Sequence, residues 1–410
     1  MTYEVVLFCV MDSKLIVILI IIHVATLLGY CEDHLESPKY PIILIPGDGG
    51  SQAYCIPKGN TQGFLVWVNL RYFLTPGSLA EYFSVKYDPE TGEISDSDLC
   101  EVVFPGWGDT WSIENLDTSK HSGTVYFESL ITALRQDPFF VSNKTIRGAP
   151  FDFRRAPNEN SAFMIKLRRL VEETYVNAAN KPVVLLGHSL GSLYTLAFFA
   201  TVSDTWKQKY VKAFLSVSGP LGGSVKALKI EASGDNFGIY IRSPVSFRPV
   251  QRSLPSTAFL LPDPRLWPPS EPLIITPTVN YSAHDYEKFF QDINFAVGYE
   301  LMRNTKSSLD GLIGPTGVNE IYCIHGSNLP TTYHMIYSEP TFYRSGFPDQ
   351  YPTLVPGNGD GTVHMRSLEL CRFWAGAKHI VLDGAEHLQI VGDPRLIDLV
   401  RQLIGARSHD

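Results

Sequence analysis

One short motif constrains the fold more than any other feature of the sequence. The motif GHSLG (187–191) directly follows the apolar run 183–186 and precedes a second apolar run, 192–200. A strand that turns through a glycine-flanked serine into a helix is a nucleophile elbow, and its turn is too tight for side chains at the glycine positions. The motif therefore predicts that Ser189 stands above the edge of a sheet, at the N-terminus of a helix.

Apolar strands alternate with helices along the rest of the chain. The sequence predicts strands at 42–45, 183–186, 213–217, 321–324 and 379–382, and helices at 120–136, 162–178 and 192–200. This alternation is typical of a mostly parallel sheet with helices on both faces. Nine prolines lie between 244 and 277. Because proline cannot donate to a strand ladder, we expect the insertion at about 224–280 to form a cap or lid outside the central sheet.

Two further segments follow the serine, and their order along the chain indicates the fold class. GDGTV (359–363) contains Asp360, and Glu386 precedes His387. The order Ser189, Asp360, His387 is that of the α/β-hydrolase fold, which is the predicted fold class. In such a triad His387 takes the serine proton, and Asp360 holds the imidazole tautomer and stabilises the imidazolium.

Other residues compete for these roles. Asp383 and Asp393 are alternative acids, and His364 is a further candidate for contact with the site. His188 is expected to point away from the site because the elbow turns its side chain aside, and His325 is expected to be structural.

The glycine-rich run PGDGG (46–50) follows the first predicted strand. Glycines let the backbone approach a substrate carbonyl, so Asp48 and Leu190 are the predicted donors of the oxyanion-hole N–H groups. A carboxylate beside developing negative charge opposes it. We therefore expect a protonated Asp48, and hence acid pH, to favour catalysis.

Composition and the remaining motifs exclude several classes of function. The chain has 34 Lys and Arg against 42 Asp and Glu, a net charge of −8, so it lacks the positive field that nucleic-acid binding needs. We find no HExxH, CxxC, Walker or dinucleotide motif, and we expect neither a metal nor a cofactor. Oligomeric state is not predicted.

The N-terminus predicts entry into the secretory pathway. Residues 15–28 are uniformly apolar after Lys14, which is typical of a signal peptide spanning 1–31, with a signal anchor as the alternative. The mature chain would be 32–410. Its cysteines Cys55, Cys100, Cys323 and Cys371 allow three disulfide pairings. Asn143 and Asn280 are predicted glycosylation acceptors on the surface.

Several of these motifs together resemble the lecithin:cholesterol acyltransferase family of α/β-hydrolases, and in particular its lysosomal phospholipase A branch. The resemblance extends from about 41 to about 403. It is carried by PGDGG, FLVWVNL (64–70), RGAPFDFRRAPNEN (147–160), GHSLG, SGDN (233–236), FFQDI (289–293), GDGTV and AEHL (385–388).

The resemblance implies a phospholipase that transfers an acyl group to water or to a lipid alcohol such as ceramide. It implies the triad and the oxyanion donors named above, a Cys323–Cys371 disulfide, a flexible lid at about 233–253 and a membrane-binding insertion at about 52–87. It also implies a lysosomal address, with the extracellular space second. One departure is that 79–81 lacks the second cysteine of the family's loop disulfide, which leaves Cys55–Cys100 as an open pairing.

The run 64–74 indicates that the protein binds a membrane phospholipid surface. Its apolar residues are predicted to be an exposed helical surface that contacts the membrane or an acyl chain, namely Leu65, Val66, Trp67 and Phe73. The alternative is that they pack on the core. The rival functions are a secreted acyltransferase that esterifies a sterol and an inactive lipid-binding homologue.

Overall fold

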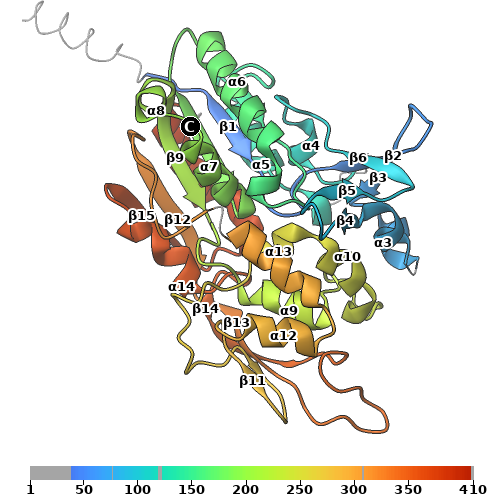
Figure 1. The fold of residues 1–410 in the computed structure, drawn as a ribbon. Coiled ribbons are helices and arrows are strands. Elements are labelled where there is room, and N and C mark those ends of the chain that lie inside the picture. Colours follow the sequence, from blue (N-terminus) through green and yellow to red (C-terminus); the bar gives the residue numbers. More distant parts are fainter. Residues whose placement is uncertain (1–37, 76, 119–121, 307–308, 408–410) are drawn as a thin grey trace, which may run out of the picture. The chain divides into compact units, whose positions relative to one another are not determined.

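A six-stranded parallel sheet forms the centre of the fold (Figure 1). The structure is a computed structural model that describes residues 38–75, 77–118, 122–306 and 309–407; the predicted signal peptide lies outside the described residues. The sheet order is β15 (Ala377–Asp383), β12 (Ile321–Ser327), β9 (Val211–Val217), β8 (Val183–His188), β1 (Ile42–Ile45) and β7 (Ile146–Gly148). Every neighbouring pair is parallel, so the predicted α/β-hydrolase fold is confirmed.

Alternate residues of each strand supply the two halves of the core. Ile43 and Leu185 belong to one apolar cluster, whereas Leu44 and Leu186 belong to the other. This separation follows from the pleat, which points successive side chains to opposite faces of the sheet.

Helices cover both faces. The cluster on the Ile43 face includes residues of α6 (Ser161–Asn177), α7 (Leu190–Ala200) and α8 (Asp204–Tyr210), and the opposite cluster includes α5 (Glu128–Leu134) and α15 (Pro394–Ile404). The predicted helix 120–136 is wrong at its start, because Val125 pairs with Asn115 in a β-bridge and the helix begins only at Glu128.

The segment between β9 and β12 forms a separate layer with an apolar cluster of its own (Figure 1). None of the nine prolines between 244 and 277 lies in the large sheet. Two short strands of this segment pair with the hairpin that follows β12, and together they form a small sheet of order β11-β10-β13-β14. The elements of the layer and of the hairpin that follows β12 are α9 (Val225–Ser233), α10 (Arg248–Ser253), α11 (Pro255–Phe259), β10 (Ile274–Ile275), β11 (Asn280–Tyr281), α12 (Tyr286–Asp292), α13 (Ala296–Lys306), β13 (Leu329–Ile336) and β14 (Thr353–Gly359).

Short helices complete the described chain. They are α4 (Trp111–Glu114), α14 (Met365–Leu368) and the 3₁₀ turns η1 (Ser122–Thr124), η2 (Pro157–Glu159), η3 (Pro244–Ser246), η4 (Glu369–Phe373) and η5 (Gln389–Gly392). Among the described residues, every helix is too short or too polar to cross a bilayer.

The segment between β1 and α4 is an insertion built on a small antiparallel sheet. Its strands are β3 (Phe64–Trp67), β2 (Ala53–Pro57) and β6 (Cys100–Val103), and a disulfide joins Cys55 to Cys100 across the β2–β6 pair. The insertion also contains α2 (Leu70–Leu74), α3 (Ser78–Phe83), β4 (Val85–Tyr87) and β5 (Ile94–Asp96). Residues 64–74 are therefore a strand followed by a short helix, and the predicted single helical run is wrong.

The predicted exposure of this run is also wrong for most of its residues. Val66, Trp67 and Phe73 are buried and Leu65 is half-buried. The Trp67 ring stacks on Phe83 at 5.5 Å, and its indole N–H donates to the carbonyl of Gly49 at 2.8 Å. Trp67 is buried because both its ring and its polar atom have partners inside the protein. The exposed apolar side chains are instead Leu70 and Leu74 on α2.

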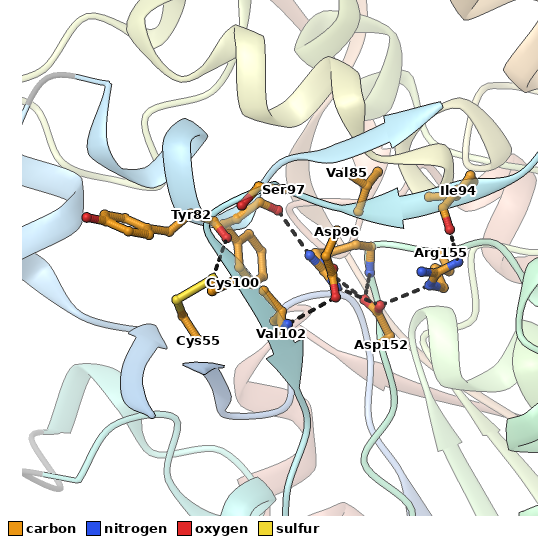
Figure 2. A network of polar contacts seen from close by, with 12 residues as sticks. Cys55, Tyr82, Val85, Ile94, Asp96, Ser97, Cys100, Val102, Asp152 and Arg155 are labelled. Carbon is orange, nitrogen blue, oxygen red and sulfur yellow. Dashed lines mark hydrogen bonds and ion pairs between the residues drawn. A yellow bond between two sulfur atoms is a disulfide. The ribbon is translucent and has the colours of Figure 1, made fainter. Parts of the chain in front are cut away.

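Two consecutive arginines attach the insertion to the core, and Figure 2 shows Arg155 together with the carboxylates Asp96 and Asp152. Arg154 follows β7 and is fully buried, and its guanidinium donates to Asp152 at 2.8 Å and to Asp96 of β5 at 2.6 Å. The neighbouring Arg155 donates to the carbonyl of Ile94 at 3.1 Å. These contacts explain why the motif 147–160 has two consecutive arginines: each one reaches the β5 strand of the insertion.

We expect Arg154→Leu to lower the free energy of unfolding by about 3 kcal/mol, because it leaves the half-buried carboxylate of Asp96 without its counter-charge, whereas Asp152 keeps its ion pair with Arg155. Chemical denaturation measures the loss. Arg168→Leu is the matched control, since Arg168 forms an exposed ion pair with Glu172 on α6, and such a pair is worth at most about 1 kcal/mol. Equal losses in the two variants would contradict this role for Arg154.

Candidate active site

The backbone at Ser189 has the geometry of a tight strand-to-helix turn. Ser189 has φ of 53° and ψ of −125° between β8 and α7. A Cβ atom at Gly191 would lie 2.3 Å from the Ile45 carbonyl oxygen, and one at Gly187 would lie 2.7 Å from the Gly191 oxygen. No other residue fits at these two positions, because real Cβ atoms essentially never approach so closely.

The structure brings the three predicted triad residues together. The Oγ of Ser189 lies 3.0 Å from Nε2 of His387, and Nδ1 of His387 lies 2.7 Å from Oδ2 of Asp360. All three are buried. These distances allow the serine proton to pass to the imidazole while the carboxylate holds the opposite ring nitrogen.

Asp360 is arranged to stay ionised. Burial by itself would raise the pKa of its carboxyl group, but the charge of His387 and a hydrogen bond from its ring hold the pKa below the usual value. The backbone N–H groups of Val363 and Thr362 also donate to the carboxylate, at 2.8 and 3.1 Å. A carboxylate with these donors can stabilise an imidazolium without taking its proton.

Asp360 reaches the site by an indirect route. It follows β14 of the small sheet, whereas His387 follows β15 of the large sheet. The β13–β14 hairpin leaves the end of β12 and returns there, since a Cβ atom at Gly326 of β12 would lie 3.1 Å from that of Asp360. The acid therefore lies at the carboxyl edge of the large sheet after all, which is where ligands bind in open α/β folds.

The loop 46–50 lies against the serine. A Cβ atom at Gly47 would come within 2.8 Å of the Ser189 Cβ. Leu190 is the first residue of α7, so its N–H has no carbonyl partner within the helix. The predicted donor residues, Asp48 and Leu190, thus stand on the two sides of Ser189.

The side chain of Asp48 reaches solvent, yet it is surrounded by enough protein that desolvation raises its pKa to about 6. The charge of Lys226, the N–H of Gly49 and the charge of His387 oppose this rise without cancelling it. The carboxyl group of Asp48 is therefore neutral in mildly acidic solution, where an ordinary aspartate is ionised.

Two residues outside the predicted site connect its loops. The hydroxyl of Tyr126 accepts from the N–H of Gly47 at 3.0 Å and contacts Nδ1 of His188. The Nε2 atom of His188 lies 2.8 Å from the carbonyl oxygen of His387, so Nε2 donates and Nδ1 accepts the Tyr126 proton. Burial lowers the pKa of His188 to about 3, which keeps this neutral tautomer.

These contacts change the interpretation of His188. The sequence indicated only a side chain turned away from the site, but the His188 ring links the loop 46–50 to the loop that carries His387. Tyr126 had no local signal in the sequence, because its partner Gly47 is 79 positions away.

The competing candidates lie elsewhere. Asp383 accepts from Ser327 at 2.9 Å, and Asp393 caps α15 and pairs with Arg395. The ring of His364 accepts from the N–H of Arg366 and stacks on Tyr333. His325 contacts His379 at 2.8 Å between their Nε2 atoms.

The structure also contains a Cys323–Cys371 disulfide besides Cys55–Cys100. Two disulfides are typical of proteins of the secretory pathway. Asn143 and Asn280 are both exposed. Within the described residues no three His, Cys, Asp or Glu side chains are grouped to hold a metal ion.

Comparison with known proteins identifies the family. The sequence pattern of the lecithin:cholesterol acyltransferase family matches residues 64–314 and 307–393. The chain belongs to this family.

Its relatives share most of their length with it. The human lysosomal phospholipase A and acyltransferase is 35% identical over 89% of this chain and 90% of the relative. The rat phosphatidylcholine-sterol acyltransferase is 34% identical over 92% of this chain and 87% of the relative. A solved lipase structure from Bacillus licheniformis aligns with 90% of this chain and 95% of its own at 10% identity, with a TM-score of 0.35. The chain is a phospholipase A/acyltransferase of its family.

We expect Tyr126→Phe to lower kcat on a soluble short-chain ester about tenfold with little change in KM, because the Gly47 N–H loses its buried acceptor and the loop 46–50 loses its link to His188. Steady-state kinetics measure both constants. Tyr175→Phe is the control and should leave them unchanged, because this half-buried ring of α6 packs on Tyr210 of α8. An unaltered kcat in Tyr126→Phe would show that the hydroxyl does not position the loop.

Proposed function

We propose that the protein removes a fatty acyl chain from glycerophospholipids through an acyl-enzyme on Ser189. The observation that carries the proposal is the chain of contacts from Ser189 through His387 to Asp360, with both distances within hydrogen-bonding range. Family membership supports a lipid ester as substrate.

The reaction has two halves. His387 takes the proton of Ser189 as the oxygen attacks the ester carbonyl, and the tetrahedral oxyanion is held by the N–H groups of Leu190 and Asp48. The imidazolium then returns the proton to the departing lysophospholipid oxygen, which leaves an acyl-serine. Water or a lipid alcohol, deprotonated by His387, attacks the acyl-serine and releases a fatty acid or an acylated alcohol.

We further propose ceramide, or another lipid alcohol, as the acceptor that competes with water. The relatives named lysosomal phospholipase A and acyltransferase support acyl transfer and a lysosomal address. The similarity to phosphatidylcholine-sterol acyltransferases favours a second candidate, a secreted enzyme with a sterol as acceptor.

The insertion and the cap layer are the parts we assign to the lipid surface. Leu70 and Leu74 on α2 are exposed and replace the buried Trp67 and Phe73 as candidates for membrane contact. Phe73 instead packs against Phe237 and Phe247 of the cap, at 5.5 and 5.8 Å between ring centroids. We propose that this aromatic cluster contacts the acyl chain and that the lid, 233–253, controls its entry.

The reaction is tested with defined liposomes that contain either ceramide or cholesterol, analysed for products at acidic and at neutral pH. We expect free fatty acid and acylated ceramide, both lost in Ser189→Ala, together with loss of labelling by a fluorophosphonate probe. A cholesteryl ester as the main product would favour the second candidate. Release of fatty acid by Ser189→Ala would contradict the mechanism.

The raised pKa of the Asp48 carboxyl group predicts how the rate depends on pH. Because the pKa of Asp48 is raised to about 6, the carboxylate forms as the pH rises through that value and opposes the oxyanion, so kcat/KM falls. Asp48→Asn, which cannot ionise, should retain its rate at neutral pH. The measurement is the pH profile of kcat/KM on a soluble ester; the same decline with pH in both proteins would rule out Asp48 as its cause.

A further inference from the structure

The loop between β13 and β14, residues 337–352, presents two aromatic side chains to solvent. Phe342 is 93% exposed and Tyr343 is 94% exposed. Their rings pack edge to face against each other with centroids 4.9 Å apart. Adjacent aromatic side chains that leave almost their whole surface in water mark a site of interaction.

Phe342 and Tyr343 lie in a turn that is ordered by hydrogen bonds. The N–H of Thr341 donates to the carbonyl of Arg344 at 2.9 Å, and the N–H of Arg344 donates back to Thr341 at 3.2 Å. The buried amide of Gln350 holds the loop from within, since it donates to the carbonyl of Ser345 at 2.6 Å and accepts from the N–H of Ser338 at 2.8 Å. The backbone therefore holds the two rings outward.

The base of the loop is fastened to the cap. Asp349 forms an ion pair with Arg248 of α10 at 2.6 Å, and the carbonyl of Pro348 accepts from the hydroxyl of Ser233 of α9 at 3.0 Å. Figure 1 shows the orange-red loop extending beyond the cap helices. Ser233 ends α9 at the start of the lid segment and α10 forms the end of that segment, so the loop contacts both ends of the lid.

The charge next to the rings is positive. Arg344 follows Tyr343 directly and is exposed; its guanidinium donates to the carbonyl of Glu339 at 3.3 Å, and it has no carboxylate partner among the described ion pairs. The lid also exposes an aromatic and an aliphatic side chain, since Tyr240 and Ile241 are 92% and 81% exposed, but Arg242, which follows them, is half-buried.

We propose that the tip formed by Phe342, Tyr343 and Arg344 docks on the surface of an anionic phospholipid bilayer. Aromatic rings occupy the boundary between headgroups and acyl chains, and an exposed arginine pairs with lipid phosphates. This inference rests on the proposed function. It adds a second contact with the membrane, separate from the contact that we propose for Leu70 and Leu74 of α2.

The tip also has a direct connection to the catalytic site. The β14 strand runs from this loop to Asp360 at its far end. Attachment at both α2 and the tip would fix the orientation of the cap on the bilayer and keep the lid between the two contacts.

The test is sedimentation with vesicles, using Ser189→Ala protein so that lipid is not consumed. In that background Phe342→Ser/Tyr343→Ser should bind vesicles of phosphatidylcholine and phosphatidylserine about tenfold more weakly. Arg344→Gln should weaken binding to these vesicles but not to pure phosphatidylcholine. Phe373→Ser is the matched control, since Phe373 is 70% exposed beside Arg372 and lies outside the loop.

Activity separates docking from damage to the site. With Ser189 restored, the double variant should lose activity on vesicles while hydrolysing a soluble short-chain ester at the normal rate. Unchanged vesicle binding, or equal loss on both substrates, would overturn the proposal. So would a dimer of the parent protein that the double variant converts to monomer, because the tip would then be an interface between copies. A wild-type protein inactive on both substrates would refute the proposed function but leave the binding result valid.

Discussion

The site depends on the close approach between α7 and the end of β1. Gly191 lets the first turn of α7 pass against the carbonyl oxygens of Ile45 and Pro46, at distances that leave no room for a side chain. This approach places the loop after β1 beside Ser189, so that a donor from the loop and a donor from α7 can face the same oxygen. A side chain at this position would separate the nucleophile from half of its oxyanion hole without changing any reacting residue.

The same loop is held from two other directions. Trp67 of the insertion donates to the Gly49 carbonyl, and Tyr126 accepts from the Gly47 N–H. Trp67 in turn stacks on Phe83, whose ring lies under the guanidinium of Arg154 at 5.1 Å. The insertion that we assign to the lipid surface is thus packed directly on the loop 46–50, which we propose to bind the oxyanion. A disturbance of the insertion is expected to reach the catalytic step through Gly49.

The sequence predicts those parts of the site that have a local pattern. GHSLG between two apolar runs predicts the elbow at Ser189. The chain order Ser189, Asp360, His387 predicts the fold, because in an α/β-hydrolase the loops that carry the acid and the histidine lie at the same edge of the sheet as the serine. Trp67 shows the limit: an apolar run looks the same whether it packs inward or faces lipid, and only its distant partners Gly49 and Phe83 decide. Tyr126 and the true start of α5 also depend on long-range pairing, which a single sequence does not display.

The proposed function depends on the transfer of a lipid acyl group to the oxygen of Ser189. The most direct measurement is the mass of the peptide that contains this serine, after the enzyme is mixed with a phospholipid of known acyl chains and rapidly quenched. If Ser189 carries the acyl group, this peptide gains the mass of one acyl chain, and added lipid alcohol shortens the lifetime of the adduct. An unmodified peptide during rapid turnover, or the adduct on another residue, would contradict the proposed function.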